Sequence, residues 1–97
     1  MGYDLTRDII ESGTLIDVRT EDEVEEDGLF EGAIHIPLDK ISESMDFVET
    51  LEFPLVLYCR SGNRSAKAVA FLEENGFGDV YNGINKDNIA DILSEES

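Results

Sequence analysis

Short apolar runs alternate along the chain with segments in which apolar residues recur every three or four positions. The most apolar run, Leu55–Tyr58, follows Pro54 and contains no charged residue. A run without polar alternation is typical of a central strand that is covered on both faces. Three further runs predict shorter strands, namely Leu15–Val18, Ala33–Ile36 and Val80–Tyr81.

Helix signals lie between these runs. Thr6 is placed as an N-cap ahead of one segment, and Thr20 with Glu23 has the spacing of a capping box. Gly76 is placed to end a longer helix. The predicted helices are Arg7–Ser12, Thr20–Glu26, Ser42–Leu51, a segment that follows Ser65 and ends near Asn75, and Asn88–Leu93. Strands that alternate with helices predict an α/β layered fold with a mainly parallel sheet.

Size and charge limit the function classes. The 97 residues suit one compact domain over residues 1–97. With 7 basic and 23 acidic side chains, the formal net charge is −16. Such a surface repels phosphate backbones and anionic lipid headgroups, so we expect no nucleic acid and no membrane as partner. A free thiol without a signal peptide favours the cytoplasm, although a periplasmic form with its signal removed would read the same.

The basic residues are unevenly distributed. Arg60, Arg64 and Lys67 fall within the segment Cys59–Lys67, which contains no Asp or Glu. An anion is expected to be drawn to this segment. Because the chain has one cysteine and one histidine, His35, it can form neither an internal disulfide nor a Cys/His metal cluster. We therefore expect no metal and no cofactor, and we expect His35 to be structural.

Cys59 stands at the end of the most apolar strand and at the start of the longest predicted helix. Unpaired amides at a helix N-terminus form an anion site and lower the pKa of a thiol there. Gly62 lets successive amides converge on one point, and arginines grip oxyanions with paired hydrogen bonds. Taken alone, the cysteine could be an inert buried residue. Taken with Gly62, Arg60 and Arg64, it predicts a nucleophile that attacks a sulfur or phosphorus centre carrying negative oxygens.

The segment Leu57–Ser65 resembles the active-site loop of the rhodanese family. The similarity extends in the same order to Leu15–Arg19 with Glu23, to Glu31–Leu38, and to the stretch from Gly76 to Gly83. The resemblance implies a three-layer domain with a mostly parallel, five-stranded sheet flanked by helices. It also implies a ping-pong reaction that moves the outer sulfur of thiosulfate, or of a persulfide donor, to a thiophilic acceptor such as cyanide or a thiol.

The resemblance implies a role for each site residue. Cys59 would carry the sulfur as a persulfide, Arg60 and Arg64 would bind the sulfonate, and Asp17 and Arg19 would support the site. The persulfide would lie among the amides of the loop, which comprises Arg60, Ser61, Gly62, Asn63, Arg64 and Ser65. Where the family often has a histidine this chain has Leu29, and it lacks the family's later tryptophan. These departures bear on substrate preference.

Three alternatives to a thiosulfate-using enzyme remain open. Phosphatases and arsenate reductases of related fold also use a loop from Cys to Arg, but phosphate needs a wider cradle than one sulfur. Four residues separate Cys59 from Arg64, one fewer than in the phosphatase loop. A non-catalytic binding module would often have lost the cysteine or its arginines. A dedicated persulfide carrier could share this loop and use the acidic surface to dock a basic protein.

Overall fold

Four short strands pair side by side in one parallel sheet. The structure is a computed structural model, and it describes residues 5–94. Its strands are β1 (Thr14–Asp17), β2 (Ile34–His35), β3 (Leu55–Tyr58) and β4 (Val80–Ile84). They lie in the order β2-β1-β3-β4, so β1 and β3 are central. The α/β class and the parallel sheet predicted from the alternation of strands and helices are confirmed.

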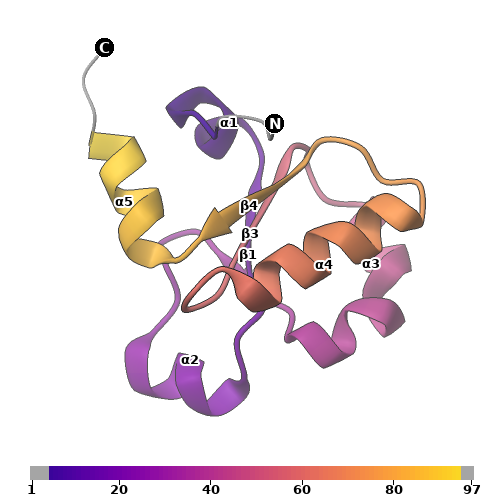
Figure 1. Cartoon of the computed structure of the whole chain (residues 1–97), viewed down its shortest axis with the longest axis horizontal. Coiled ribbons are helices and arrows are strands. Elements are labelled where there is room, and N and C mark those ends of the chain that lie inside the picture. Colours follow the sequence, from indigo (N-terminus) through magenta and orange to yellow (C-terminus); the bar gives the residue numbers. More distant parts are fainter. Residues whose placement is uncertain (1–4, 95–97) are drawn as a thin grey trace.

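Helical segments cover both faces of this sheet (Figure 1). They are α1 (Arg7–Ser12), α2 (Glu21–Asp27), the 3₁₀ helix η1 (Leu38–Ser44), α3 (Met45–Glu49), α4 (Asn63–Glu74) and α5 (Lys86–Ser94). Helices α1 and α5 lie on one side of the strands, and α3 and α4 lie on the other. Helix α2 projects beyond the carboxyl end of β1, toward the bottom of Figure 1.

Strand β3 shows why both faces need cover. Leu55 and Leu57 point into the apolar cluster under η1, α3 and α4, whereas Val56 and Tyr58 point into the cluster under α1 and α5. All four side chains are fully buried. Successive strand residues point to opposite faces, so an unbroken apolar run is what a doubly covered strand requires.

The predicted caps are present, and they set the helix starts. The Thr6 hydroxyl accepts a hydrogen bond from the Ile9 amide at the start of α1. At α2 the capping box is complete, because Thr20 accepts from the Glu23 amide and the Glu23 carboxylate accepts from the Thr20 amide. Each cap satisfies amides that the first helical turn leaves without a partner.

Two expectations need correction. Residues 5–94 supply a four-stranded sheet, where the family resemblance implied five strands. The helix predicted over Ser42–Leu51 is shorter, since α3 covers Met45–Glu49 and the turns before it form the 3₁₀ helix η1. Pro37 begins η1, and the short polar side chains Ser42 and Ser44 compete for backbone hydrogen bonds, as in the bond from the Ser44 hydroxyl to the Lys40 carbonyl.

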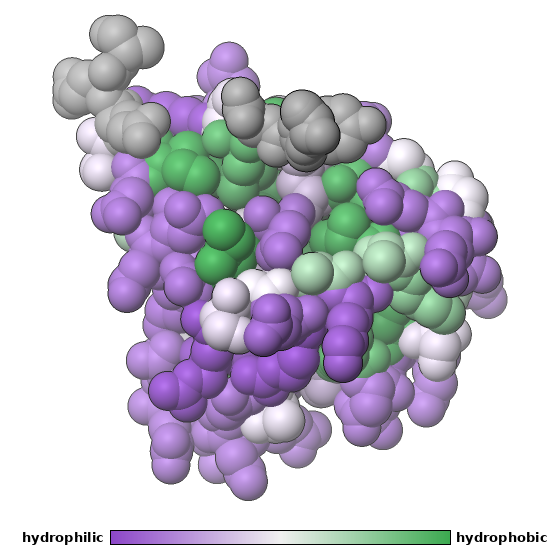
Figure 2. Space-filling view, viewed as in Figure 1, coloured by the Kyte–Doolittle hydropathy of each residue, from purple (hydrophilic) through white to green (hydrophobic). Residues whose placement is uncertain are grey.

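The surface in Figure 2 is mainly hydrophilic, most densely so in the lower part of that view, where α2 lies. Helix α2 consists of Glu21, Asp22, Glu23, Val24, Glu25, Glu26 and Asp27, so six of its seven residues are acidic. In the part of the chain that the structure describes, no helix has the length and apolar character needed to cross a membrane.

Candidate active site

Cys59 lies directly after β3 and four residues before α4 begins. Its amide donates to the Ile84 carbonyl at the end of β4, 3.0 Å away, which continues the sheet pairing past the last strand residue. The residue is only 2% exposed. The sheet therefore delivers the thiol to the carboxyl end of its central strands, where ligands bind in open α/β folds.

A loop of backbone and hydroxyl groups surrounds the sulfur. The Gly62 amide donates to the Cys59 Sγ atom at 3.1 Å, and the Ser65 Oγ atom lies 3.4 Å from it. Gly62 is the N-cap of α4 and has a φ of +95°, a left-handed conformation that glycine adopts without steric cost. That conformation turns the amide toward the sulfur, so the loop forms the anion nest expected from the sequence.

Asn82 on β4 holds this loop in place. Its Oδ1 atom accepts from the Ser65 hydroxyl at 2.6 Å and from the Ile84 amide at 2.9 Å, and its Nδ2 atom donates to the Gly62 carbonyl at 3.2 Å. Sequence reasoning missed this residue. The available signal was a polar side chain at the carboxyl end of a strand, next to the loop in the sheet order.

The environment lowers the pKa of Cys59 below its ordinary value. Burial opposes ionisation and is the largest single influence, but the Ser65 hydroxyl and the amides of Ser65, Gly62 and Ser61 together outweigh it. Hydrogen bonds to a thiolate stabilise it relative to the thiol. The fraction of reactive thiolate at neutral pH is therefore larger than for a free cysteine, whose pKa is about 8.5.

A cavity of about 600 Å³ opens over Cys59 between α2 and the start of α5. Its cationic lining residues are Arg19, Arg60 and Lys86. Its acidic lining residues are Glu23, Glu26, Asp27 and Asp87. The three cations and four carboxylates leave one excess negative charge among the lining residues.

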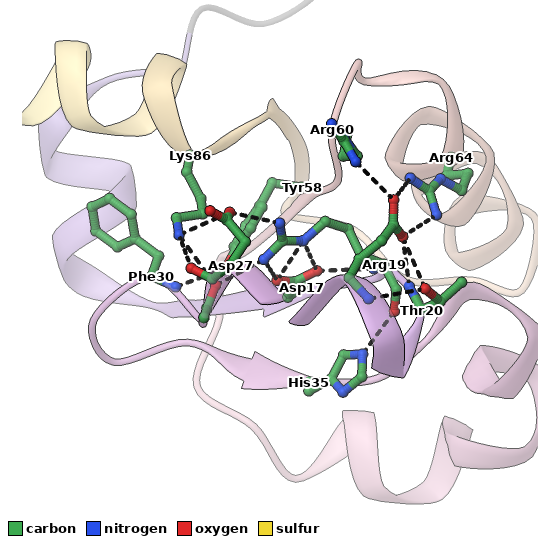
Figure 3. Close-up of polar contacts among 12 residues, drawn as sticks. Asp17, Arg19, Thr20, Asp27, Phe30, His35, Tyr58, Arg60, Arg64 and Lys86 are labelled. Carbon is green, nitrogen blue, oxygen red and sulfur yellow. Dashed lines mark hydrogen bonds and ion pairs between the residues drawn. The ribbon is translucent and has the colours of Figure 1, made fainter. Parts of the chain in front are cut away.

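Asp17 and Arg19 form a buried ion pair at one wall of this cavity (Figure 3). The Arg19 Nη2 atom lies 2.7 Å from the Asp17 Oδ2 atom, and both side chains are at most 4% exposed. Arg19 also reaches Asp27 at 2.9 Å, and Asp27 in turn pairs with Lys86 at 3.1 Å. The hydrogen bonds from Arg19 and Lys86 lower the pKa of Asp27, and the bond with Asp17 raises that of Arg19. The network ties α2 to the start of α5.

A second ion pair joins α2 to α4 (Figure 3). Arg64 donates to both carboxylate oxygens of Glu23, at 2.7 and 2.9 Å, and Arg60 lies 3.8 Å from the same group. The paired hydrogen bonds from Arg64, with the Thr20 amide, lower the pKa of Glu23 to about 2. Glu23 is thus a carboxylate at any physiological pH, and Arg64 is held by it.

Residues 3–84 match the sequence model of the rhodanese-like domain. The chain belongs to the rhodanese family. It is 41% identical over 66 residues to a putative sulfurtransferase, YtwF, of Bacillus subtilis, and 37% identical over 68 residues to a sulfurtransferase of Allochromatium vinosum. These alignments cover 68% and 70% of this chain and 62% of each relative, so the chain matches less than two thirds of those proteins.

A solved rhodanese from E. coli, described with anions, superposes on this chain with a TM-score of 0.71 at 29% identity. The match covers 79% of this chain and 91% of the E. coli chain. The predicted membership of the rhodanese family and the predicted fold are therefore confirmed by both sequence and structure.

The three basic residues of the Cys59–Lys67 segment line different cavities. Arg60 lines the Cys59 cavity, whereas Arg64 lines a neighbouring cavity beside Pro37, and Lys67 lies in a third beside Phe71. Arg60 lies on the loop before α4, whereas Arg64 and Lys67 lie on the helix itself, one turn apart. The sulfonate-binding role of Arg60 and Arg64 therefore stays a prediction, and so does the supporting role of Asp17 and Arg19.

Among the other predicted residues, Ser61 approaches the sulfur through its backbone amide. Ser61 and Asn63 are exposed on the loop. His35 contacts the Arg19 carbonyl through its Nε2 atom at 2.7 Å, a backbone contact rather than a catalytic partnership. Lys86 is a cavity residue that the sequence analysis did not identify, because its position depends on where α5 packs.

Gly62→Ala is expected to destabilise the protein by about 1–2 kcal/mol, because an L-residue is strained in the left-handed conformation. A Cβ atom at this position would also lie 3.2 Å from the Ile84 Cγ2 atom, and we expect the loop to relieve this contact by drawing the Gly62 amide away from Cys59. The pKa of the thiol should then rise. Urea unfolding measures the first effect, and the pH dependence of thiol alkylation measures the second.

Gly76→Ala is the matched control. Gly76 has a similar φ of +92°, but a Cβ atom there would meet nothing within 4 Å. This variant should lose similar stability and leave the thiol pKa unchanged. An equal change of the thiol pKa in both variants would contradict the role assigned to the Gly62 amide.

Proposed function

We propose that this protein is a sulfurtransferase in which Cys59 carries a sulfur atom as a persulfide. It takes the outer sulfur from thiosulfate or from a persulfide donor and passes it to a thiophilic acceptor, such as cyanide or a small-molecule or protein thiol. The observation that carries this proposal is the contact of Cys59 Sγ with the Gly62 amide and the Ser65 hydroxyl at the floor of an open cavity.

The site residues support each half of such a reaction. The Cys59 thiolate attacks the outer sulfur of the donor, a new S–S bond forms, and the donor's S–S bond breaks with its electron pair leaving on sulfite or on a thiolate. The nest of amides that now faces Cys59 would stabilise the anionic persulfide. The acceptor then attacks the outer sulfur, and Cys59 leaves as the thiolate it was at the start. Because the enzyme is modified between the two halves, the kinetics would be ping-pong.

The geometry offers less support for phosphoryl chemistry. A Cys-to-Arg phosphatase loop needs its arginine to grip the phosphate oxygens. Here Arg64 is bonded to Glu23 through both Nη atoms and lines a cavity other than that over Cys59. A dedicated persulfide carrier for one partner protein uses the same Cys59 chemistry and differs only in its acceptor.

The test is to incubate the protein with thiosulfate, and separately with a low-molecular-weight persulfide, and to weigh it intact. A gain of one sulfur atom that cyanide removes, with formation of thiocyanate, is expected. Hydrolysis of an aryl phosphate without sulfur uptake from either donor would overturn the proposal in favour of a phosphatase.

A further inference from the structure

Every cation that lines the Cys59 cavity already has a carboxylate partner. Arg19 pairs with Asp17 and Asp27, Lys86 pairs with Asp27, and Arg60 lies near Glu23. A small dianion entering the cavity would therefore find each of these cations within 3.8 Å of a carboxylate. It would also meet one excess negative charge from the lining residues, before the charge of the thiolate is added.

Among these carboxylates, Glu23 has the largest effect on the arginines of the loop. It is bonded at both oxygens to Arg64 and stands 3.8 Å from Arg60, the two arginines that the loop offers to an oxyanion. Its position is fixed independently, because the Thr20 amide donates to its Oε1 atom at 2.9 Å in the capping box of α2. Glu23 is only 20% exposed, so solvent screens its bond to Arg64 less than the bond to Arg60, which is 69% exposed.

We infer that Glu23 is a specificity-determining residue, which pairs with Arg64, lowers the positive potential at Arg60 and so disfavours thiosulfate as the sulfur donor. This inference rests on the proposed sulfurtransferase function and names its donor class. The donor is the persulfide of a thiol that carries little or no net negative charge. A cationic or uncharged thiol compound enters the cavity without the electrostatic cost that thiosulfate meets.

Loading from such a donor balances without a further reactant. The Cys59 thiolate attacks the outer sulfur of R–S–SH, and a new S–S bond forms between Cys59 and that sulfur. The S–S bond of the donor breaks, and R–S⁻ leaves with the electron pair and takes a proton from water. The sulfane sulfur moves from one thiol to another, and no external oxidant or reductant takes part. Thiosulfate would load the same atom, but the dianion sulfite would have to leave through the same negative cavity.

The experiment compares Glu23→Gln with the unaltered protein, with thiosulfate and with cysteamine persulfide as donors. Glutamine can keep the capping-box hydrogen bond, so α2 should start at the same residue. We expect kcat/KM for thiosulfate to rise about tenfold, mainly through a lower KM, since the two released arginines attract the dianion. For cysteamine persulfide, whose ammonium cancels its negative charge, we expect a change below about twofold.

Glu26→Gln is the matched control, because it removes the same charge from the same helix and the same cavity. Among residues 5–94, Glu26 holds no arginine or lysine in an ion pair. Its effect on thiosulfate should stay below about threefold, as expected for a change in the general field alone. Equal gains in Glu23→Gln and Glu26→Gln would overturn the inference, as would equal effects of Glu23→Gln on both donors.

Two further outcomes distinguish a failure of this inference from a failure of the proposed sulfurtransferase function. If neither donor loads Cys59 in the unaltered protein, the proposed function itself fails. If both donors load it, the salt dependence of the unaltered protein gives a reading that needs no variant. Added sodium chloride should lower the KM for thiosulfate, because it screens a net repulsion. A KM that rises with salt would mean that the cavity attracts the dianion, and the inference would be wrong.

Discussion

Cys59→Ser is expected to abolish sulfur uptake. A serine hydroxyl is hardly ionised at neutral pH and cannot form a persulfide, so the intact mass should not change with any donor. The cysteine is the only one in the chain, and no second thiol can take over its role. We expect a loss of at least about a thousandfold in the rate of thiocyanate formation, which corresponds to about 4 kcal/mol in the barrier.

The fold should survive this change. The serine Oγ atom can accept from the Gly62 amide as the sulfur does, so the stability should fall by no more than about 1–2 kcal/mol in urea unfolding. Sulfur uptake by a folded Cys59→Ser protein would contradict the assignment of Cys59 as the carrier. The unaltered protein supplies a second measurement. Its loading rate should rise with pH with a midpoint below that of a free cysteine, because the folded site lowers the thiol pKa.

Asp17→Ala is expected to destabilise the fold by about 3–5 kcal/mol, because it leaves the Arg19 guanidinium buried without its main partner. Asp17 is fully buried, and it accepts hydrogen bonds from the Nε and Nη2 atoms of Arg19 and from the Arg19 amide. The measurement is the free energy of unfolding from urea titration. Since that loss is comparable to the whole stability of many small domains, the variant should be largely unfolded at 37 °C.

Asp27→Ala is the matched control for this prediction. It removes the other carboxylate on Arg19, but Asp27 is 60% exposed, so solvent weakens its bond and the loss of stability should be much smaller than for Asp17→Ala. The double variant Asp17→Ala with Arg19→Met should recover part of the loss, since it leaves no unpaired buried charge. If Asp17→Ala costs no more stability than Asp27→Ala, the pair is not the buried support described above.

Local signals were enough to predict much of the fold. The helix Arg7–Ser12 and the strand Leu55–Tyr58 were predicted with the bounds observed, because a cap and a proline mark their limits. Strand β4 was predicted to end at Tyr81 but continues to Ile84. Its polar residues pair there because the neighbouring strand needs hydrogen-bond partners, which is a tertiary requirement that no local pattern carries.

The same distinction applies to the candidate site. The turn from strand to helix at Cys59 and the nest at Gly62 follow from residues that are close in sequence. The partner of Arg64 does not, because Glu23 lies 41 positions earlier and is one of 23 acidic residues that could have paired with it. The clustering of basic residues in the sequence predicted an anion site. The structure shows that the arginines of this segment already lie beside a carboxylate.

The burial of Cys59 sets different size limits on the donor and on the acceptor of the proposed reaction. With the residue 2% exposed, the bare thiol can be reached only by a slim group at the tip of a donor. In the proposed persulfide, the transferable atom would lie about 2 Å further out, at the end of a new S–S bond. Broad acceptors, including the surface cysteine of another protein, therefore meet a smaller steric barrier than broad donors do. The pocket thus restricts the width of the sulfur donor more strictly than the width of the sulfur acceptor.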